Sequence, residues 1–295
     1  MSSSPLTNVT VAGGTGVLGF HIVEALLNDG SFNVKVLRRL PKTANEKAEL
    51  LASKGAEIIY ADYNQHDDLV QVLSGTDALI SAAAPGVANG GYDFDALQTP
   101  LLNAAKAAGV RRFIPSEFGT ETQLGDHPMT DTKATFRQKV KESGLEYTFI
   151  ITGTFAEYLG WVGFDIKNKT AKFYVDGTSA LAVTSLSDIG KYTAETLKLE
   201  ESRNATIRIA GSMFPLNEIL KLFEEATGSK WEVTVDKEIK HRYENKIDPV
   251  PSQMEVFVAA ISEKGSFGNI DNNKFSFSPR PLADDIAVIV QQASG

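Results

Sequence analysis

The chain has 295 residues, of which 42% are hydrophobic and 22% charged, so it can bury the core of one large domain or two ordinary ones. Its net charge of −8, with acids and bases interspersed, excludes a basic surface for nucleic acid or anionic lipid. The absence of cysteine excludes disulfides, thiolate metal sites and cysteine nucleophiles, and the four histidines are scattered without metal-ligand spacing. The polar start and the lack of a long apolar segment predict a cytoplasmic protein with no membrane and no direct nucleic-acid partner.

The first elements are a strand, a glycine-rich turn and a helix. The segment "NVTVAGGTGVLGFHIVEALLNDG" begins with a β-branched run and changes to helical spacing of apolar residues after its glycines. A turn spaced G-x-x-G-x-x-G lets backbone N–H groups approach a pyrophosphate at the positive end of a helix, although three glycines at this spacing also occur by chance in loops. The predicted cofactor contacts in this turn are Gly13, Thr15, Gly16, Val17, Leu18 and Gly19.

A second strand, "FNVKVLRR", ends about 20 residues after the turn, where the ribose-recognising residue of a dinucleotide site is expected. No acid stands at its end, but Arg38 and Arg39 do, followed by Lys42 and Lys47. A carboxylate there would repel a 2′-phosphate, whereas guanidinium groups bind one bidentately. The pattern therefore favours NADPH over NADH, and the alternative is that the two arginines are merely solvated.

Strands and helices continue to alternate as far as "LEYTFII". This alternation predicts the α/β class with a Rossmann-type doubly wound parallel sheet, whose ligands bind at the carboxyl ends of the strands. Asp62 and Tyr63 lie at one such end and are expected near the adenine. The small residues 82–85 lie at another, where Ala83 and Ala84 permit close approach of the cofactor. We expect residues 1–152 to form the dinucleotide-binding domain and residues 153–295 mainly a smaller substrate-binding lobe, with some elements returning to the first domain.

The segment "MTDTKATFRQKVKESG", residues 129–144, predicts a helix that buries Phe136 and Val140 on one face and stops at Gly144. Its candidate N-caps are Thr130, Asp131 and Thr132. Lys133 then falls in or beside the first turn, where the positive helix end disfavours a cation. For an isolated lysine, the plain interpretation is an ammonium in water.

The second half predicts mixed elements. The segment "TGTFAEYLGWVGFD" carries four aromatic residues at helical spacing, about half of which we expect in the core: Phe155, Tyr158, Trp161 and Phe164. A hairpin is predicted for "AKFYVDGTSALAVTSL", a helix capped at Ser187 for "SDIGKYTAETLKL", and a returning strand for "NATIRIAG". Two amphipathic helices follow, "PLNEILKLFEEATG" and "VPSQMEVFVAAISEKG", and "GSFGNIDNN" is interpreted as a mobile loop able to close on a ligand.

Several segments together resemble a known group of proteins. They are "GGTGVLG" at 13–19, "EKAELL" at 46–51, "YADYNQHDDL" at 60–69, "RRFIPSEFG" at 111–119, "KATFRQKVKESGLEYT" at 133–148 and "VTSLSDIGKYTAETL" at 183–197. The sequence resembles the isoflavone reductase-like and phenylcoumaran benzylic ether reductase group, within the NmrA-like family of atypical short-chain dehydrogenases. The resemblance is most specific between residues 111 and 148.

The resemblance implies an NADPH-dependent reductase that acts on an aromatic or conjugated small molecule. Lys133 matches the lysine regarded in that group as catalytic or cofactor-positioning, which would hydrogen-bond the nicotinamide ribose, or polarise or protonate a substrate oxygen. The positive helix end and the oxidised nicotinamide are expected to lower its pKa. Arg39 best matches the phosphate-binding arginine of the group, and Phe155 is placed near the nicotinamide.

The sequence also departs from the wider superfamily, because no tyrosine has a lysine four residues later, so the usual Tyr-x-x-x-Lys pair is absent. His127 is a candidate partner for Lys133, although a loop histidine before a proline is more often a surface residue. Epimerase or lyase chemistry is disfavoured without the tyrosine acid. The rival hypothesis is an NmrA-like transcriptional co-regulator that senses dinucleotide without turnover. Lys133 separates the two hypotheses, because the resemblance implies that such members lack a functional lysine at this point. The substrate is not indicated, and we expect a monomer or a homodimer.

Overall fold

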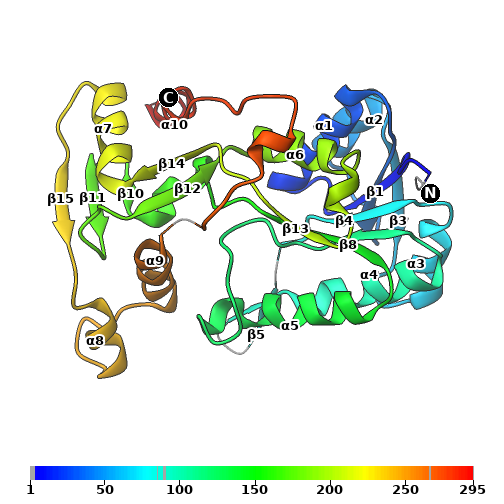
Figure 1. The fold of residues 1–295 in the computed structure, drawn as a ribbon, viewed down its shortest axis with the longest axis horizontal. Helices are drawn as coiled ribbons and strands as arrows, with labels where there is room; N and C mark the ends of the chain where they lie inside the picture. Colours follow the sequence, from blue (N-terminus) through cyan, green and yellow to red (C-terminus); the bar gives the residue numbers. More distant parts are fainter. Residues whose placement is uncertain (1–3, 85, 89–90, 266, 295) are drawn as a thin grey trace. The chain divides into compact units, whose positions relative to one another are not determined.

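The computed structural model describes residues 4–84, 86–88, 91–265 and 267–294. The chain divides into two compact units (Figure 1). The first unit consists of Met1–Glu117, Thr122–Ile150 and Ile189–Ile207, and the second of Phe118–Glu121, Ile151–Asp188 and Arg208–Gly295.

The first unit is built on a seven-stranded sheet with the order β13-β8-β7-β4-β1-β2-β3. Its strands are β1 (Asn8–Ala12), β2 (Asn33–Arg39), β3 (Glu57–Ala61), β4 (Ala78–Ser81), β7 (Arg112–Ile114), β8 (Glu146–Ile151) and β13 (Ala205–Arg208). The pairings that join β3, β2, β1, β4, β7 and β8 are all parallel. The chain winds outward from β1 in both directions, so the switch point of the topology lies between β1 and β4. The predicted Rossmann-type α/β fold is confirmed.

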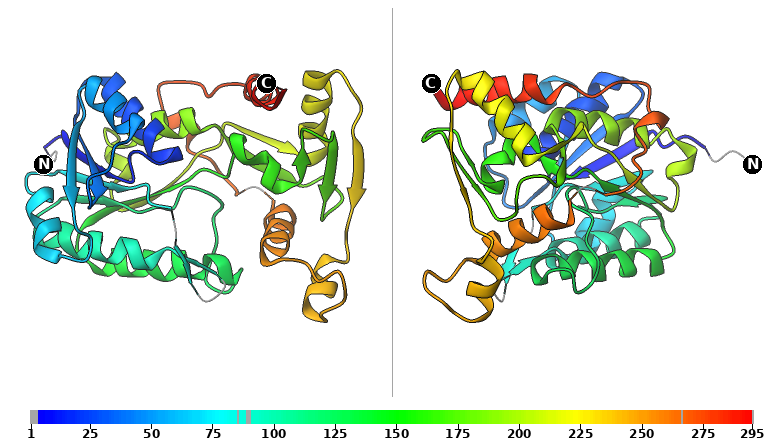
Figure 2. Two further views of the ribbon diagram at one scale, coloured as in Figure 1. Left: turned by 180° about the vertical axis from the view of Figure 1, so that it is seen from behind. Right: turned by 60° about the vertical axis from the view of Figure 1, so that its left-hand side comes forward.

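Helices cover both faces of this sheet (Figure 2), with α1, α2 and α6 on one face and α3, α4 and α5 on the other. Their bounds are α1 (Val17–Asp29), α2 (Glu46–Ser53), α3 (His66–Leu73), α4 (Asp95–Ala107), α5 (Pro128–Glu142) and α6 (Leu186–Thr196), with a 3₁₀ turn η2 (Glu200–Ser202). Gly190 lets α6 approach α1, because a Cβ at this position would stand 2.4 Å from the carbonyl oxygen of His21. A short hairpin that the sequence did not predict, β5 (Gly86–Ala88) and β6 (Gly91–Asp93), follows β4.

The core of the first unit explains its sequence pattern. Strands β1 and β4 are buried along almost their whole length, as expected for a parallel sheet with helices on both faces. On the α3 to α5 face, Phe136 and Val140 of α5 are fully buried in a cluster with Phe113 and Phe149. The predicted buried face of this helix is therefore confirmed.

The second unit contains two three-stranded sheets, with the orders β10-β11-β15 and β14-β12-β9. The strands are β9 (Thr154–Phe155), β10 (Phe164–Asp165), β11 (Thr170–Phe173), β12 (Ala180–Thr184), β14 (Ser212–Pro215) and β15 (Glu232–Val235). The helices are α7 (Leu216–Thr227), α8 (Ile239–Glu244), α9 (Gln253–Lys264) and α10 (Leu282–Ser294), with 3₁₀ turns η1 (Ala156–Val162) and η3 (Asn272–Lys274). Both predicted amphipathic helices, α7 and α9, are confirmed.

The predicted hairpin in the second unit is wrong, because its two strands belong to different sheets. Strand β11 pairs with β10 and β15, whereas β12 pairs with β14 and β9. The connecting turn is fastened elsewhere: Gly177, at a positive φ of 78°, accepts a hydrogen bond through its carbonyl oxygen from the Asn217 N–H at the start of α7. The cap of α6 also differs, since the Ser185 hydroxyl rather than that of Ser187 accepts from the Asp188 N–H at 3.3 Å.

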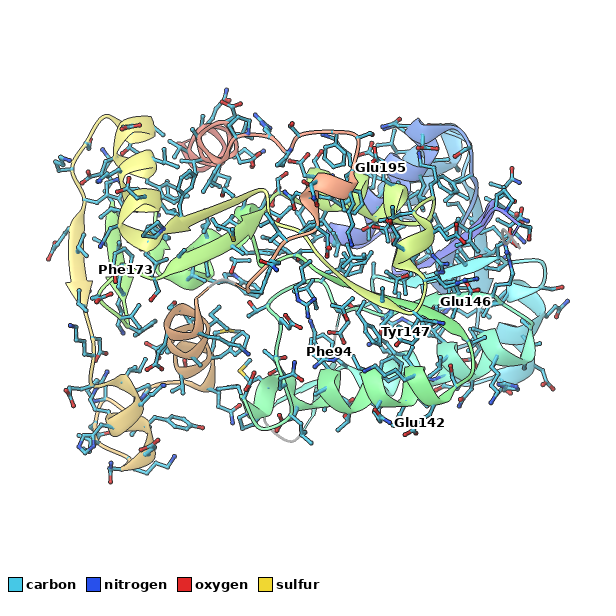
Figure 3. The ribbon with its side chains drawn as sticks, in the orientation of Figure 1. Phe94, Glu142, Glu146, Tyr147, Phe173 and Glu195 are labelled. Atoms are coloured by element: carbon cyan, nitrogen blue, oxygen red, sulfur yellow. The ribbon has the colours of Figure 1, made fainter. Side chains whose placement is uncertain are left out.

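The aromatic residues after β8 are less buried than predicted. Only Phe164 is in the core, where its ring stacks on Phe223 with centroids 5.0 Å apart and packs near Phe173, which is labelled in Figure 3. Phe155 and Tyr158 are half-buried, and Trp161 is 61% exposed. The helical spacing that suggested a common face is broken, because η1 has non-helical backbone angles at Tyr158.

The interpretation of "GSFGNIDNN" as a loop free to close is wrong for its second half; Ser266 in its first half lies outside the described residues. The Asn272 side chain accepts from the Ala210 N–H at 3.1 Å and donates to the Ala210 carbonyl oxygen at 2.7 Å. Asp271 accepts from the Arg208 N–H at 2.8 Å and donates back through its own N–H at 2.6 Å. Four hydrogen bonds therefore fasten this segment to residues 208–210.

Candidate active site

The three glycines of the G-x-x-G-x-x-G motif have different structural roles. Gly13 has a positive φ of 79°, and a Cβ there would stand 2.8 Å from the carbonyl oxygen of Ala82. A Cβ at Gly19 would stand 2.1 Å from the carbonyl oxygen of Gly13. Both positions are needed for the packing of the turn itself. Gly16 has ordinary backbone angles and is exposed, so it forms the open side of the turn, although a Cβ there would make one tight contact, 3.1 Å from the Gly13 carbonyl oxygen.

Helix α1 begins at this open side without a side-chain cap. Gly16 is the N-cap in an extended conformation, and its N–H donates to the Gly13 carbonyl oxygen at 2.9 Å. The N–H groups of Val17, Leu18 and Gly19 form the first turn, where the helix has no internal acceptors for them. Thr15 and Leu18 are half-buried and Val17 is exposed. Uncapped N–H groups at a positive helix end are a suitable donor set for a pyrophosphate.

The cations at the end of β2 and after it have different surroundings. Arg38 donates to the Thr43 carbonyl oxygen and to the Tyr60 hydroxyl, each at 2.9 Å, so its guanidinium fixes the local backbone. Arg39 is exposed, and its side chain makes no hydrogen bond or ion pair within the part of the chain that the structure describes. Lys47, in the first turn of α2, is also exposed, with Nζ 5.3 Å from the centroid of the Phe20 ring. Of the two arginines, Arg39 is therefore the one whose guanidinium has no such contact with a described residue.

The predicted residues at the ends of β3 and β4 lie as follows. Asp62 accepts from the Asn64 N–H at 2.9 Å, which closes the turn after β3, and the neighbouring Tyr63 packs against the core with its pKa raised by burial. Ala83 is half-buried, and its carbonyl oxygen accepts from the Ser116 hydroxyl at 3.1 Å. Ala84 is exposed. The last of the small residues at the end of β4, residue 85, lies outside the described residues.

Helix α5 begins one turn earlier than predicted. Pro128 occupies its first position, where the missing N–H of proline is harmless and its fixed φ suits the helix. The N-cap is His127, whose Nδ1 accepts from the Met129 N–H at 3.2 Å. The three predicted caps lie inside the helix, and Lys133 lies in the second turn rather than the first. The surface interpretation of His127 is also wrong, because its side chain is buried as the cap.

The interpretation of Lys133 as a solvated lysine is wrong, because its side chain is only 8% exposed. Its Nζ donates to the carbonyl oxygen of Glu117 at 3.1 Å and lies 4.6 Å from the centroid of the Phe94 ring, which Figure 3 shows beside α5. Burial lowers the pKa of the Lys133 ammonium; the Glu117 carboxylate opposes this effect and the Arg137 guanidinium adds to it. A lowered pKa agrees with the prediction, but its main cause is burial rather than the helix end.

Successive contacts connect the glycine turn to the lysine along the carboxyl edge of the sheet. The end of β1 meets the end of β4 where Gly13 packs on Ala82. The next residue, Ala83, is bound by Ser116 after β7, and the residue after Ser116 is Glu117, which binds Lys133. Strands β1, β4 and β7 are neighbours in the sheet. The turn and the lysine therefore belong to one continuous edge of the first unit.

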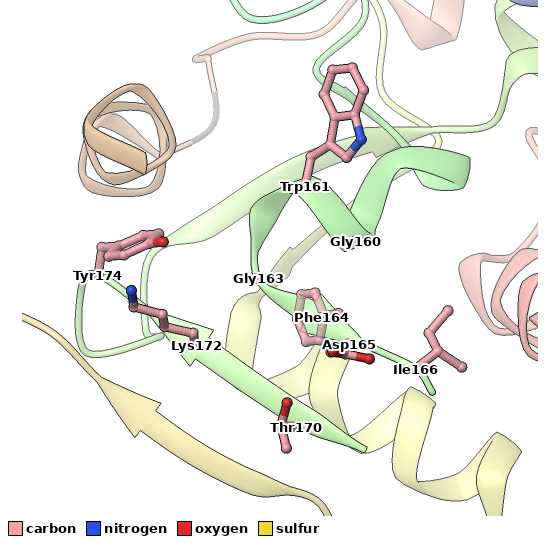
Figure 4. A pocket seen from close by; sticks show the side chains of 9 residues that line it. All are labelled: Gly160, Trp161, Gly163, Phe164, Asp165, Ile166, Thr170, Lys172 and Tyr174. Atoms are coloured by element: carbon pink, nitrogen blue, oxygen red, sulfur yellow. The ribbon is translucent and has the colours of Figure 1, made fainter. Parts of the chain in front are cut away.

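The second unit contributes Phe155 and an open hollow. Phe155 ends β9, with its ring centroid 5.7 Å from that of Tyr158. An open hollow of about 490 Å³ lies beside Trp161, Asp165 and Lys172 (Figure 4). Its cation, Lys172, is paired with Glu255 at 3.0 Å, and its lining includes neither Phe155 nor Lys133. This hollow therefore does not coincide with the predicted site.

Sequence reasoning missed one buried ion pair beside Lys133. Arg137 donates to Oε2 of Glu117 at 2.7 Å; the Glu117 side chain is buried and that of Arg137 is mostly so. The signal was present, because Arg137 follows Lys133 by four residues and therefore shares its helix face. Within the described residues, no group of three or more histidine, aspartate or glutamate side chains could hold a metal ion. No described helix is both long enough and apolar enough to cross a membrane.

A parallel sheet with an uncapped glycine turn at its switch point defines a Rossmann-type dinucleotide-binding protein. Residues 6–280 match the NmrA-like family, so the chain belongs to this family. Pinoresinol reductase 2 of Arabidopsis thaliana is 32% identical over 265 residues, which cover 80% of this chain and 83% of the relative. The sequence resemblance to the isoflavone reductase-like group is thereby confirmed.

Solved structures have the same fold. AtPrR2 in complex with NADP+ and (+)pinoresinol superimposes with a TM-score of 0.78 at 23% identity, covering 97% of this chain and 100% of the other. The binary complex of leucoanthocyanidin reductase with NADPH from Vitis vinifera gives 0.77 at 24% identity, covering 96% and 99%. At these identities the two structures show the fold that this chain shares.

Proposed function

We propose that this chain is an NADPH-dependent reductase that transfers a hydride to an aromatic or conjugated small molecule. The observation that carries the proposal is Lys133, a buried ammonium on the same sheet edge as the glycine turn. No carboxylate of a described residue lies within ion-pair distance of its Nζ. Burying a charge without such a partner is unfavourable, and perturbed groups of this kind concentrate at functional sites.

The residues on this edge are suited to NADPH. The N–H groups at residues 16–19 would bind the pyrophosphate, Arg39 the 2′-phosphate with Lys47 nearby, and residues 62, 83 and 84 the remaining surface of the dinucleotide. When bound, NADPH supplies the hydride. We assign Phe155 to the nicotinamide on the basis of the family resemblance and its partly exposed ring. The relatives described above are reductases, and two are solved with NADP+ or NADPH, which supports this cofactor and reaction class.

Lys133 would hydrogen-bond the reacting oxygen of the substrate and hold a proton beside it. An ammonium has three N–H donors, of which the Glu117 carbonyl oxygen accepts one. The other two can hydrogen-bond a substrate oxygen or a ribose hydroxyl, and the lowered pKa makes release of a proton easier. Phe94, across the ammonium, excludes water on one side. His127 caps α5, so its observed contact assigns it a role in placing the helix that carries Lys133.

Other parts of the proposal rest on the sequence. The cysteine-free composition supports a cytoplasmic location, and the acidic, unclustered charge supports a small-molecule substrate rather than direct binding to nucleic acid. We propose a monomer or a homodimer. The rival function, a dinucleotide-sensing co-regulator without turnover, would use the turn and Arg39 equally and differ at Lys133.

The test is a screen of aromatic enones, quinones and benzylic ethers in which consumption of NADPH is followed by its absorbance. The wild type is compared with Lys133→Met and with Lys139→Met, a matched control on the same helix whose lysine is about half exposed and pairs with Asp95. We expect turnover in the wild type and the control and its loss in Lys133→Met. No turnover of any compound, with NADPH still bound, would favour the co-regulator.

A further inference from the structure

Arg137 lies one helical turn after Lys133 on α5 and contacts the same residue, Glu117. Lys133 contacts the backbone carbonyl oxygen of Glu117, whereas Arg137 contacts its carboxylate. Its guanidinium donates to Oε2 of Glu117 at 2.7 Å and also to the carbonyl oxygen of Thr122. The side chains of Arg137 and Glu117 are 13% and 1% exposed. Glu117 and Thr122 flank residues 118–121, so one guanidinium fixes both ends of this short segment.

Glu117 is thereby held at two points. Its carboxylate is bound by Arg137 and its carbonyl oxygen by Lys133. A buried ion pair is weak evidence of added stability, because desolvation of the two charges offsets their attraction, but it does impose a specific geometry. The geometry imposed here is that of the acceptor to which the Lys133 ammonium is bound.

We propose that Arg137 is a positioning residue for Lys133: by holding Glu117 and Thr122, it aims the Glu117 carbonyl oxygen at Nζ and so orients the two remaining N–H donors of the ammonium. This inference rests on the proposed reductase function, which gives those donors a target. The pair also acts on the charge of Lys133. The positive charge of Arg137 lowers the pKa of Lys133, and the negative charge of Glu117 raises it.

The same unit contains a matched control pair at the opposite, amino ends of the strands. Arg112, at the first residue of β7, is 5% exposed and lies 3.1 Å from Oε2 of Glu146, which begins β8 and is labelled in Figure 3. Its guanidinium also donates to the Ser202 hydroxyl at 2.9 Å. Because β7 and β8 are parallel, this pair lies at their amino ends, whereas Glu117 follows the carboxyl end of β7. Arg112→Lys disturbs a buried arginine–carboxylate pair without touching the candidate site.

The first experiment measures the pKa of Lys133 in the protein without cofactor or substrate. Lysine labelled at Cε and Nζ is followed by NMR through a pH titration, and the Lys133 resonance is assigned by its absence in Lys133→Met. We expect Arg137→Gln to raise the pKa of Lys133 by about one unit and Glu117→Gln to lower it by a similar amount, because the two changes remove charges of opposite sign. Arg112→Lys should leave it unchanged.

The second experiment uses Arg137→Lys, which keeps the charge but cannot bind both acceptors in the fork geometry of a guanidinium. On a compound found by the screen, we expect kcat to fall about tenfold to a hundredfold, the usual effect of a misplaced catalytic group, with the KM for NADPH within about twofold of wild type. Arg112→Lys should lower the midpoint of thermal unfolding but keep kcat and its pH profile.

These readouts separate the two proposals. If no compound is reduced, the reductase function fails, and the NMR titration still tests whether Arg137 and Glu117 set the state of Lys133. Opposite shifts in the two charge variants, together with a fall of kcat in Arg137→Lys but not in Arg112→Lys, support the positioning role. A pKa of Lys133 that does not move, or that moves equally in Arg112→Lys, overturns it. Should Arg137→Gln not fold, Glu117→Gln carries the test of the Lys133 pKa, and Arg137→Lys carries the test of positioning through kcat.

Discussion

Replacing Lys133 by methionine should lower activity and raise stability at the same time. Methionine has a similar length and no charge, so it can fill the space beside the Phe94 ring. If the ammonium acts on a reacting oxygen, its loss should reduce turnover about a hundredfold, equivalent to about 2.7 kcal/mol of transition-state stabilisation. A residue whose only role is structural would show the opposite sign in stability, because its removal leaves a defect.

The stability change can be worked out from the contacts. The variant loses the hydrogen bond to the Glu117 carbonyl oxygen, worth about 1 kcal/mol, and the cation–π contact with Phe94, worth about 1–2 kcal/mol. It also removes the desolvation penalty of a buried ammonium, which is several kcal/mol. The net gain is about 1–2 kcal/mol, which raises the thermal midpoint of a chain of this length by roughly 2–3 °C.

The dependence on pH gives an internal check. The pKa of Lys133 in the folded state lies below the ordinary value of 10.5, so the folded protein binds this proton less tightly than the unfolded chain. The wild type is therefore penalised below its folded pKa, and the penalty is relieved as the pH rises towards 10.5. The advantage of Lys133→Met should be full near neutral pH and shrink at high pH. Thermal unfolding at several pH values measures it, and a destabilised variant with unchanged turnover would refute the argument.

Three further predictions concern cofactor binding and pH. NADPH should bind at least about tenfold more tightly than NADH, and Arg39→Ala should remove most of this preference. Titration calorimetry measures both affinities, with Arg38→Ala as the control, and equal losses for both cofactors would contradict the assignment. Gly16→Val should abolish binding of both dinucleotides, because its side chain would occupy the exposed side of the turn. Its Cβ would also lie 3.1 Å from the Gly13 carbonyl oxygen, so circular dichroism must show that the variant keeps its fold. Burial raises the pKa of Asp285 to about 6, so the free energy of unfolding should fall as the pH rises from about 4 to about 6, and Asp285→Asn should remove this fall in thermal melts.

The first unit was predictable because its information is local. Each strand of its parallel sheet is a short apolar run, and each helix has its own 3.6-residue pattern, so the order of elements specifies a doubly wound topology with few alternatives. The β5–β6 hairpin was missed because its glycine-rich segment has no alternating apolar pattern. In the second unit, β11 and β12 were predicted as strands, but their partners β15 and β14 lie far along the chain, and no local signal identifies such pairings.

The sequence identified the candidate residues of the site but not how they are arranged. The glycine spacing and the lysine were recognised, yet Pro128 and His127 moved the helix start by a turn, and this start could not be read from candidate caps alone. The roles of Gly13 and Gly19 in packing the turn required the position of Ala82, which comes from another strand. The Arg137–Glu117 pair joins residues 20 apart in the sequence on different elements, so only the folded chain reveals it.

Cofactor affinity alone cannot separate a reductase from a dinucleotide sensor, because both would use the glycine turn and Arg39 in the same way. Lys133 can separate them. In a sensor, burial of its ammonium would reduce the stability of the fold without contributing to any reaction. In a reductase, the two N–H donors that no described residue accepts would find acceptors in the bound complex. We therefore expect the NMR resonance of Lys133 to shift when NADPH is added and again with a reducible compound, while that of the exposed Lys139 stays constant. A Lys133 resonance that ignores both additions would make the sensor the better explanation.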